Sequence, residues 1–441
     1  MSEATRVATT TAGQSLSSAE FEDATYRKVT WHLLPFLMLC YIVAYLDRVN
    51  VGFAKLQMLS DLKFSETVFG LGAGMFFIGY FFFEVPSNVI MHRVGARVWI
   101  ARIMVTWGII SACTLFVTTP LAFYAIRFLL GVAEAGFFPG MILYLTYWYP
   151  AQRRAKMVAA FMVAIPLSGV LGGPLSGAIM SFTQGAMGWP GWKWMFLLEA
   201  VPAFLVGVAT ILYLDSGIRH AKWLTEEQKQ LLERNIANEA QGKVEHPSLM
   251  ALFADKRLWL MSWIYFTCVM GQYGLTFWMP TLVKAAGITS VLNVGLVTAI
   301  PYLCTAIAMV LLGASADRHH ERRWHLVIPM VLGGAGLVVS VLAGSHTVFA
   351  IACLSIAGAG IISSAPLFWS LPTAFLAGTA AAAGIAAINS VANLAGFCSP
   401  YMVGWLKDMT HSNQAGMYVL ALILAAGAAT VLTVPAKMVN K

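Results

Sequence analysis

The sequence predicts an all-α integral membrane protein with twelve transmembrane helices in two pseudo-symmetric six-helix halves. Of its 441 residues, 59% are hydrophobic and only 11% are charged, whereas a soluble domain carries about 25% charged residues. The apolar residues are gathered in runs of roughly 20, which is the length of a helix that crosses a bilayer and about twice that of a barrel strand. One long polar segment divides these runs into two sets of six.

Twelve apolar segments predict the individual membrane spans. Several exceed about 20 residues, and tilt within the bilayer accommodates such lengths. In chain order, the predicted spans cover residues 33–54, 67–90, 98–117, 121–147, 157–182, 194–214, 258–280, 292–313, 325–343, 347–370, 375–405 and 415–435.

Polar segments outside the spans predict the domain boundaries. A capping box, Thr225-Glu-Glu-Gln228, lies in the long polar segment and predicts that a surface helix over 229–238 follows it. We expect a cytoplasmic tail over 1–30, an N-terminal six-helix half over 31–214, a cytoplasmic linker over 215–256, a C-terminal six-helix half over 257–436 and a cytoplasmic C-terminus over 437–441.

Positive charge is distributed unevenly between the two sets of loops. One set holds few cationic residues, whereas most Lys and Arg lie in the termini and in the other set. This asymmetry is typical of multi-pass proteins of the cell inner membrane and predicts that both termini are cytoplasmic. The net charge of +8 is thereby explained without a nucleic-acid partner. The few cations of the first set are Lys55, Lys63, Lys193, Lys284 and Lys407.

Four charged residues inside predicted spans are the strongest functional candidates. Asp47 and Arg48 lie in the first span, and Arg127 and Glu134 lie seven residues apart in the fourth. Charges within a membrane are costly and usually face a polar cavity or a proton path. Helical rise places the two arginines at similar depth, about 10 Å from the outer surface, and Glu134 deeper. Neighbouring Asp47 and Arg48 point about 100° apart around their helix.

These four residues suggest a coupling mechanism. Arginine binds a carboxylate through two parallel hydrogen bonds, so Arg48 and Arg127 are candidate anion ligands. Asp47 and Glu134 would neutralise the arginines in the empty site, and their protonation would free the arginines for an anion. The alternative is a static arginine–carboxylate network that only fixes helix packing.

Short cytoplasmic motifs recur in the two halves and carry a family resemblance. The loop after the eighth span contains Gly313-x-x-x-Asp317-Arg318, and the loop after the second contains Arg97 in a basic counterpart. The chain resembles transporters of the major facilitator superfamily, which implies that Asp317, Arg318 and Arg97 belong to a gating loop. The first-half copy departs from the superfamily pattern, with Ser87 and Met91-His92 where Gly and Asp are usual.

Longer segments are similar to one branch of that superfamily, the anion:cation symporter family. Its members carry tartrate, phthalate, nicotinate, hydroxyphenylacetate and sugar acids, usually with protons, and are expected to be monomers. The resemblance supports Asp47 and Glu134 as proton-coupling residues and Arg127 as a substrate ligand. The matching segments are Tyr45-Leu-Asp-Arg-Val-Asn-Val-Gly52, Gly79-Tyr-Phe-Phe-Phe-Glu-Val-Pro-Ser-Asn88, Arg127-Phe-Leu-Leu-Gly-Val-Ala-Glu-Ala-Gly-Phe-Phe-Pro-Gly140 and Gly384-Ile-Ala-Ala-Ile-Asn-Ser-Val-Ala-Asn393.

The spans of the second half contain almost no charge and present neutral polar groups instead. Amides and hydroxyls can bind the hydroxyl or carbonyl groups of a substrate without adding charge. For the asparagines, hydrogen bonding between helices is an open alternative. The candidate substrate-binding residues of this kind are Gln272, Tyr273, Trp369, Asn389 and Asn393, to which the first half adds Tyr45 and Tyr80. For Glu84, near Pro86, we predict a structural contact at a helix end, and we assign no role to Glu199.

Together these observations predict a proton-coupled symporter that imports a small organic carboxylate, either a hydroxy dicarboxylate such as tartrate, a sugar acid or an aromatic acid. The alternatives are an anion exchanger and a transporter-like membrane sensor of an organic acid. An enzyme is not expected, because the chain lacks a metal motif, a phosphate-binding loop and a nucleophile–base pair. We expect no metal and no cofactor, with protons as the coupling ion, and lipid and the substrate anion as partners.

Overall fold

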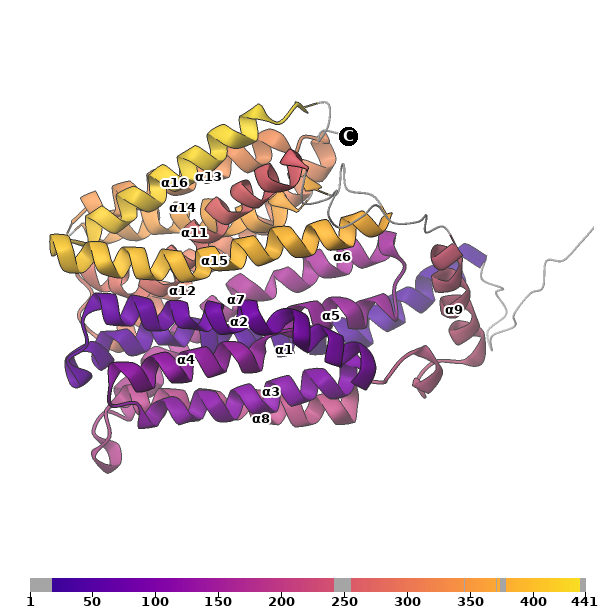
Figure 1. Ribbon diagram of the computed structural model, residues 1–441, viewed down its shortest axis with the longest axis horizontal. Helices are drawn as coiled ribbons and strands as arrows, with labels where there is room; N and C mark the ends of the chain where they lie inside the picture. Colours follow the sequence, from indigo (N-terminus) through magenta and orange to yellow (C-terminus); the bar gives the residue numbers. More distant parts are fainter. Residues whose placement is uncertain (1–17, 242–254, 345, 370, 373–377, 437–441) are drawn as a thin grey trace, which may run out of the picture.

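The computed structural model describes residues 18–241, 255–344, 346–369, 371–372 and 378–436, and these residues form helices and connecting turns without strands (Figure 1). The predicted all-α fold is therefore confirmed. The helices are α1 (Ser18–Leu62), α2 (Glu66–Val94), α3 (Ala96–Cys113), α4 (Pro120–Glu134), α5 (Phe137–Thr146), α6 (Ala151–Met162), α7 (Ala164–Phe182), α8 (Gly191–Tyr213), α9 (Glu226–Gln241), α11 (Lys256–Ala285), α12 (Val291–His319), α13 (Arg323–Leu342), α14 (Thr347–Phe368), α15 (Gly378–Thr410) and α16 (Asn413–Thr433).

Within the described residues, ten helical stretches are long and apolar enough to cross a membrane. They coincide with ten of the twelve predicted spans, and α11 and α15 occupy the positions of the other two. These two helices have 30 and 33 residues, so at ~1.5 Å per residue each exceeds the ~30 Å hydrocarbon core. Both run alongside the other long helices (Figure 1).

The first six spans and the last six meet along the middle of the molecule. Helix α7 of the N-terminal half contacts α12 of the C-terminal half, and α2 contacts α15. Helices α1 and α11, one from each half, also contact each other. The space that lies among these helices is therefore bounded by both halves.

A group of charges joins the halves at the end of the bundle opposite α9. Glu66 at the start of α2 pairs with Lys55 of α1 at 2.6 Å and with Lys407 of α15. Asp408 of α15 accepts the backbone N–H of Thr67 at 2.7 Å. Lys55 is 4% exposed and lies 4.1 Å from the centre of the Trp278 ring. This cluster, Lys55, Glu66, Lys407 and Asp408, is called the interhalf clasp below.

The predicted fourth span is interrupted directly after Glu134. Helix α4 ends there, and α5 begins at Phe137 after Gly136, which adopts φ +87°. A left-handed conformation suits glycine, and it redirects the chain. The Ser87 hydroxyl donates to the Ala135 carbonyl at 2.6 Å and accepts from the Trp99 indole at 2.9 Å. Ser87, which departs from the superfamily pattern, therefore satisfies a carbonyl that the break leaves free.

The elements that were predicted to be cytoplasmic differ from the prediction mainly in length. Helix α1 begins at Ser18 and so includes the end of the predicted tail. The capping box is confirmed, because the Thr225 N–H and the Gln228 side chain bond at 3.2 Å while the Gln228 N–H and the Thr225 hydroxyl bond at 3.3 Å. Residues 1–17 of the predicted tail, 242–254 of the linker and 437–441 at the C-terminus lie outside the described residues.

Candidate functional site

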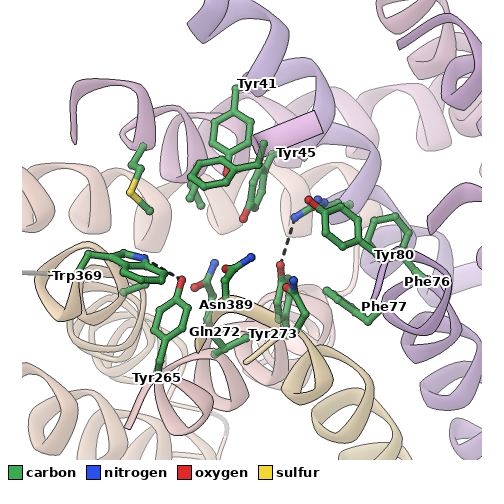
Figure 2. A pocket seen from close by; sticks show the side chains of 17 residues that line it. Tyr41, Tyr45, Phe76, Phe77, Tyr80, Tyr265, Gln272, Tyr273, Trp369 and Asn389 are labelled. Atoms are coloured by element: carbon green, nitrogen blue, oxygen red, sulfur yellow. Dashed lines mark hydrogen bonds between the residues drawn. The ribbon is translucent and has the colours of Figure 1, made fainter. Parts of the chain in front are cut away.

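A central cavity lies between the two halves (Figure 2). Tyr41, Tyr45 and Tyr80 line it from the N-terminal half and face Gln272 and Tyr273 of α11. The full set of lining residues is Tyr41, Tyr45, Arg48, Phe76, Phe77, Tyr80, Phe138, Met162, Ile165, Tyr265, Val269, Gln272, Tyr273, Ala365, Trp369, Asn389 and Asn393. Every predicted substrate-binding residue except Arg127 belongs to this lining.

Arg48 is the one charged residue among the described residues that line the cavity. One guanidinium nitrogen donates to the Glu134 carboxylate and another to the Tyr273 hydroxyl at 3.2 Å. Its Nε has no hydrogen-bond partner among the described residues. The guanidinium carbon lies 5.0 Å and 5.7 Å from the ring centres of Tyr45 and Tyr80, within reach of cation–π attraction. Arg48 thus connects the two halves, and its Nε–H is available to bond a further acceptor.

Glu134 and Arg127 lie behind this surface on α4, each 1% exposed. Helix α4 can approach α2 because Gly131 has no side chain: a Cβ there would lie 1.9 Å from the Phe76 carbonyl oxygen. Arg127 does not reach the cavity lining, and two of its nitrogens, Nε and Nη2, lack a partner in the described part of the chain. Its guanidinium lies 5.3 Å from the centre of the Phe76 ring. The geometry therefore places Arg127 one layer behind Arg48.

Asp47 points away from the cavity. Its carboxylate accepts hydrogen bonds from the Trp107 indole and from the Ser111 hydroxyl at 3.0 Å, both on α3. Asn50 donates a third bond to it at 3.3 Å. Asp47 therefore forms no hydrogen bond with Arg48, its donors are neutral, and its proposed role in balancing an arginine stays a prediction. The physical reason is the turn of ~100° between successive helical residues, which directs Asp47 to α3 when Arg48 faces the cavity.

The C-terminal half lines the cavity with uncharged side chains. Its polar members, called the neutral wall below, are Tyr265, Gln272, Tyr273, Trp369, Asn389 and Asn393. The Trp369 indole donates to the Tyr265 hydroxyl at 3.3 Å, as Figure 2 shows. The side-chain amides of Asn389 and Asn393, one turn apart on α15, donate to the Glu84 carboxylate at 3.4 Å and 3.5 Å. The alternative of hydrogen bonding between helices is therefore observed for both asparagines, which also line the cavity, while their contact with a substrate stays a prediction.

Glu84 was not predicted to belong to this site. The sequence suggested a structural contact at a helix end, but the residue is 6% exposed and sits between the halves, one turn from Tyr80. The missed signal is the four-residue spacing from Tyr80, which puts both side chains on one face of α2. Tyr265 was also missed. It lies seven residues, or about two helical turns, before Gln272 and therefore on the same face of α11.

The residues assigned to a gating loop lie within helix ends. Asp317 and Arg318 belong to the last turn of α12 and are exposed, and Asp317 pairs with Arg322 at 2.6 Å. Arg97 lies in the first turn of α3 and donates from Nε to the Ile211 carbonyl of α8 at 3.0 Å. These bonds stay within one half, so the gating assignment remains a prediction.

Comparison with known proteins adds three findings. The sequence profile of the Major Facilitator Superfamily matches residues 37–400. "Putative metabolite transport protein NicT" of Pseudomonas putida is 48% identical over 95% of this chain and 96% of its own, and "Putative tartrate transporter" of Agrobacterium vitis is 50% identical over 92% and 90%. The crystal structure of a D-xylose-proton symporter is similar with a TM-score of 0.72 at 16% identity, over 93% of this chain and 99% of that one.

Proposed function

Because the chain belongs to the Major Facilitator Superfamily and is therefore a multi-pass membrane transporter rather than an enzyme, we propose that it imports a small organic carboxylate together with protons. The observation that carries this proposal is the Arg48–Glu134 pair beside the cavity. Among the described residues, Arg48 is the one cation that lines the cavity, and its partner Glu134 is an acid that can be neutralised by a proton.

The charge of Arg48 supports an anionic substrate. A guanidinium in a poorly hydrated cavity gains more from a carboxylate than it would in water, because the effective dielectric constant is lower. The buried Nε of Arg48 lacks a partner among the described residues, and the Tyr273 hydroxyl can be displaced. A substrate carboxylate would therefore satisfy donors that the empty site leaves weakly bonded.

Proton coupling follows from the same pair. When Glu134 is ionised, it neutralises Arg48 and competes with the substrate. Protonation removes that competition, so the site binds an anion more tightly and, by linkage, the bound anion favours protonation. The second cation, Arg127, lies on the same helix as Glu134. When Glu134 is protonated, Arg127 leaves a positive charge behind the site. Import with protons is the direct consequence when the proton gradient points inward.

The neutral wall supports a substrate that carries hydroxyl or carbonyl groups in addition to its carboxylate. Gln272, Asn389 and Asn393 offer amides at the cavity, opposite Tyr45 and Tyr80. Such groups can donate and accept. A hydroxy dicarboxylate, in keeping with the name of the Agrobacterium vitis relative, is the first candidate, and sugar acids and aromatic acids are the others. The transporter is proposed to act as a monomer in the cell inner membrane with both termini cytoplasmic, without a cofactor.

The test is thermal melting of the purified protein against tartrate, galactonate, phthalate, nicotinate and hydroxyphenylacetate, at acidic and at neutral pH. A ligand that binds only the folded state raises the melting temperature. We expect one acid to do so more strongly at acidic pH, and to accumulate in proteoliposomes under an inward proton gradient.

The alternatives give different outcomes in the same experiments. An anion exchanger would take up the acid only when an anion is loaded inside, regardless of the proton gradient. A sensor would bind the acid without accumulating it. A stabilising shift from a cation or a neutral compound, with none from any carboxylate, would remove the anion assignment.

A further inference from the structure

A buried acid that the proposed mechanism does not use lies next to two side chains of the cavity. Glu84 of α2 is 6% exposed and does not itself belong to the cavity lining. The side-chain nitrogens of Asn389 and Asn393 donate to its Oε1 at 3.4 Å and to its Oε2 at 3.5 Å. Both asparagines line the cavity, so each of these side chains contacts the acid and the cavity at once.

The charge of Glu84 decides which end of each amide faces the cavity. Each oxygen of the carboxylate receives one N–H, and such donors favour the ionised form, which can only accept hydrogen bonds. An amide that turned over would point its oxygen at the carboxylate, acceptor against acceptor. Both asparagines therefore donate to Glu84 with their NH₂ groups and keep their carbonyl oxygens for other partners.

The two carbonyl oxygens are free to receive a donor. In the described part of the chain, the side chains of Asn389 and Asn393 form no hydrogen bond other than those to Glu84. The two residues are one turn apart on α15, ~6 Å along the helix axis, and Asn389 lies across the cavity from Tyr45 (Figure 2). This part of the neutral wall is thus a pair of acceptors, whereas Arg48 of the N-terminal half offers donors.

Such a wall distinguishes substrate groups that donate from groups that only accept. A hydroxyl can donate to an amide oxygen, but an oxo group or a second carboxylate has no hydrogen to offer. Enclosing one of these groups against the wall would leave both partners without a hydrogen bond, and sites built to bond a hydroxyl reject such analogues strongly. An acid with a hydroxyl group is therefore preferred over the corresponding oxo acid.

We propose that Glu84 is a positioning residue for specificity, which holds the amides of Asn389 and Asn393 with their oxygens toward the cavity so that the site selects carboxylates with hydroxyl donors. Glu84 acts on the substrate through the two asparagines and does not contact it. The inference rests on the proposed carboxylate transport and adds to it the residue that decides between hydroxy acids and acids without a donor.

The test is Glu84→Gln with two pairs of acids, malate with oxaloacetate and galactonate with 2-oxogalactonate. The members of each pair differ only by a hydroxyl or an oxo group at one carbon. Glutamine keeps the size of the side chain, but one of its two ends is an NH₂ donor. One asparagine must then turn its oxygen toward the glutamine and its NH₂ toward the cavity. Calorimetric titration of the purified protein gives the dissociation constants.

We expect the unmodified protein to bind the hydroxy acid of at least one pair ~10-fold more tightly than the oxo acid, because the oxo acid leaves a buried acceptor without a donor. In Glu84→Gln this preference should shrink at least ~5-fold, chiefly because the oxo acid gains the new NH₂ donor and binds more tightly. If Glu84 only fixed the packing of helices, its loss would weaken both acids alike.

Glu66→Gln is the matched control, because it also removes a carboxylate of α2 that bonds α15, but at the interhalf clasp. It should leave the ratio of the two dissociation constants unchanged. Equal binding of hydroxy and oxo acids by the unmodified protein overturns the proposal, and so does a parallel loss of both in Glu84→Gln. Binding of nicotinate or phthalate but of no hydroxy acid overturns it as well, while the proposed carboxylate transport stands.

A measurement without substrate separates this inference from the proposed function. Nuclear magnetic resonance of protein labelled with ¹⁵N-asparagine reports the side-chain NH₂ groups, and Asn389→Ala and Asn393→Ala assign the two signals. Both signals should shift in Glu84→Gln and stay in place in Glu66→Gln, and unchanged signals contradict the bonds to the carboxylate. If no carboxylate binds the unmodified protein, the proposed function is wrong, and these signals still decide whether Glu84 holds the amides.

The two asparagine variants also serve if Glu84→Gln does not fold. Each of Asn389→Ala and Asn393→Ala removes one oriented acceptor and should lower the preference for the hydroxy acid about 5-fold, through weaker binding of that acid. An unchanged preference in both variants overturns the proposal.

Discussion

The two halves of the transporter line the same cavity with opposite kinds of chemistry. The N-terminal half contributes Arg48, with Glu134 and Arg127 directly behind it, whereas the C-terminal half contributes amides, phenols and an indole. Glu84, a further acid of the N-terminal half, lies at the boundary between the two halves. The protonation state of the site can therefore change in one half without altering the shape of the opposite wall.

The contacts between the halves at the cavity follow the same division. Arg48 donates to Tyr273, and Asn389 and Asn393 donate to Glu84. In each case a charged group of the N-terminal half meets a neutral group of the C-terminal half. Hydrogen bonds to charged groups contribute about 1.5–3 kcal/mol, roughly twice a neutral one. Loss of charge on one side would weaken a contact between the halves, which suits a transporter that must open around its site.

Removal of the cavity cation, Arg48, should have the largest effect. It tests directly whether the N-terminal half binds the charge of the substrate. We expect Arg48→Ala to lower uptake at least ~100-fold, because a substrate carboxylate would lose a charge-assisted bidentate partner. Arg48→Lys should recover part of the activity, since it keeps the charge but not the planar fork. Initial uptake rates in proteoliposomes measure both.

Arg219→Ala is the control for loss of a positive charge, because Arg219 is exposed and pairs with Glu233 away from the cavity. Its uptake should match the unmodified protein. Substantial uptake by Arg48→Ala would mean that the N-terminal half does not hold the substrate's charge.

The sequence was sufficient for the fold and for most of the polar residues that line the cavity, but not for Glu84 and Tyr265 or for which groups bond to one another. Apolar run lengths locate the helices because a span must bury its own backbone hydrogen bonds. They could not locate the break at Gly136, since an apolar run continues on both sides and its stabilising partner, Ser87, lies on another helix. Helical geometry separates Asp47 from Arg48, yet it cannot decide which of them faces the cavity. The partners of Glu84 are more than 300 residues away along the chain, beyond any local pattern.

Neutralising Glu134 should have the next largest effect. It separates the loss of proton coupling from the loss of substrate binding. Glutamine cannot ionise, so Glu134→Gln fixes Arg48 in its uncompensated state. We expect gradient-driven accumulation to fall ~30-fold while the substrate still binds. The stabilising shift in melting temperature, which should grow as pH falls in the unmodified protein, should become nearly independent of pH in the variant.

Glu226→Gln is the matched control, because that acid is exposed on α9 and should leave the pH dependence intact. Full pH-driven uptake by Glu134→Gln would show instead that the pair with Arg48 is a static structural contact.

The neutral wall should respond differently and more weakly. Asn393→Ala removes one amide from the cavity and one bond to Glu84. We expect the dissociation constant for the substrate to rise about 5-fold, in line with ~1 kcal/mol for a neutral hydrogen bond. The pH dependence of binding should keep its shape, because no ionisable group is lost. Calorimetric titration at two pH values gives both results, and a changed pH profile would place coupling in the C-terminal half as well.

The smallest expected effect concerns the interhalf clasp, where both halves contribute charged groups. Lys55 and Glu66 lie on one side and Lys407 and Asp408 on the other. Lys407→Met removes one ion pair that joins the halves at this end. A partly exposed pair contributes about 0.5–1 kcal/mol, so the ratio of molecules with the halves apart at this end to molecules with the halves in contact there should rise about 2- to 5-fold. Pulsed electron paramagnetic resonance between spin labels at Lys63→Cys and Thr410→Cys, in a background without native cysteines, measures that ratio. An unchanged distance distribution would mean that contacts among uncharged groups close this end, and that charge has its main role at the cavity.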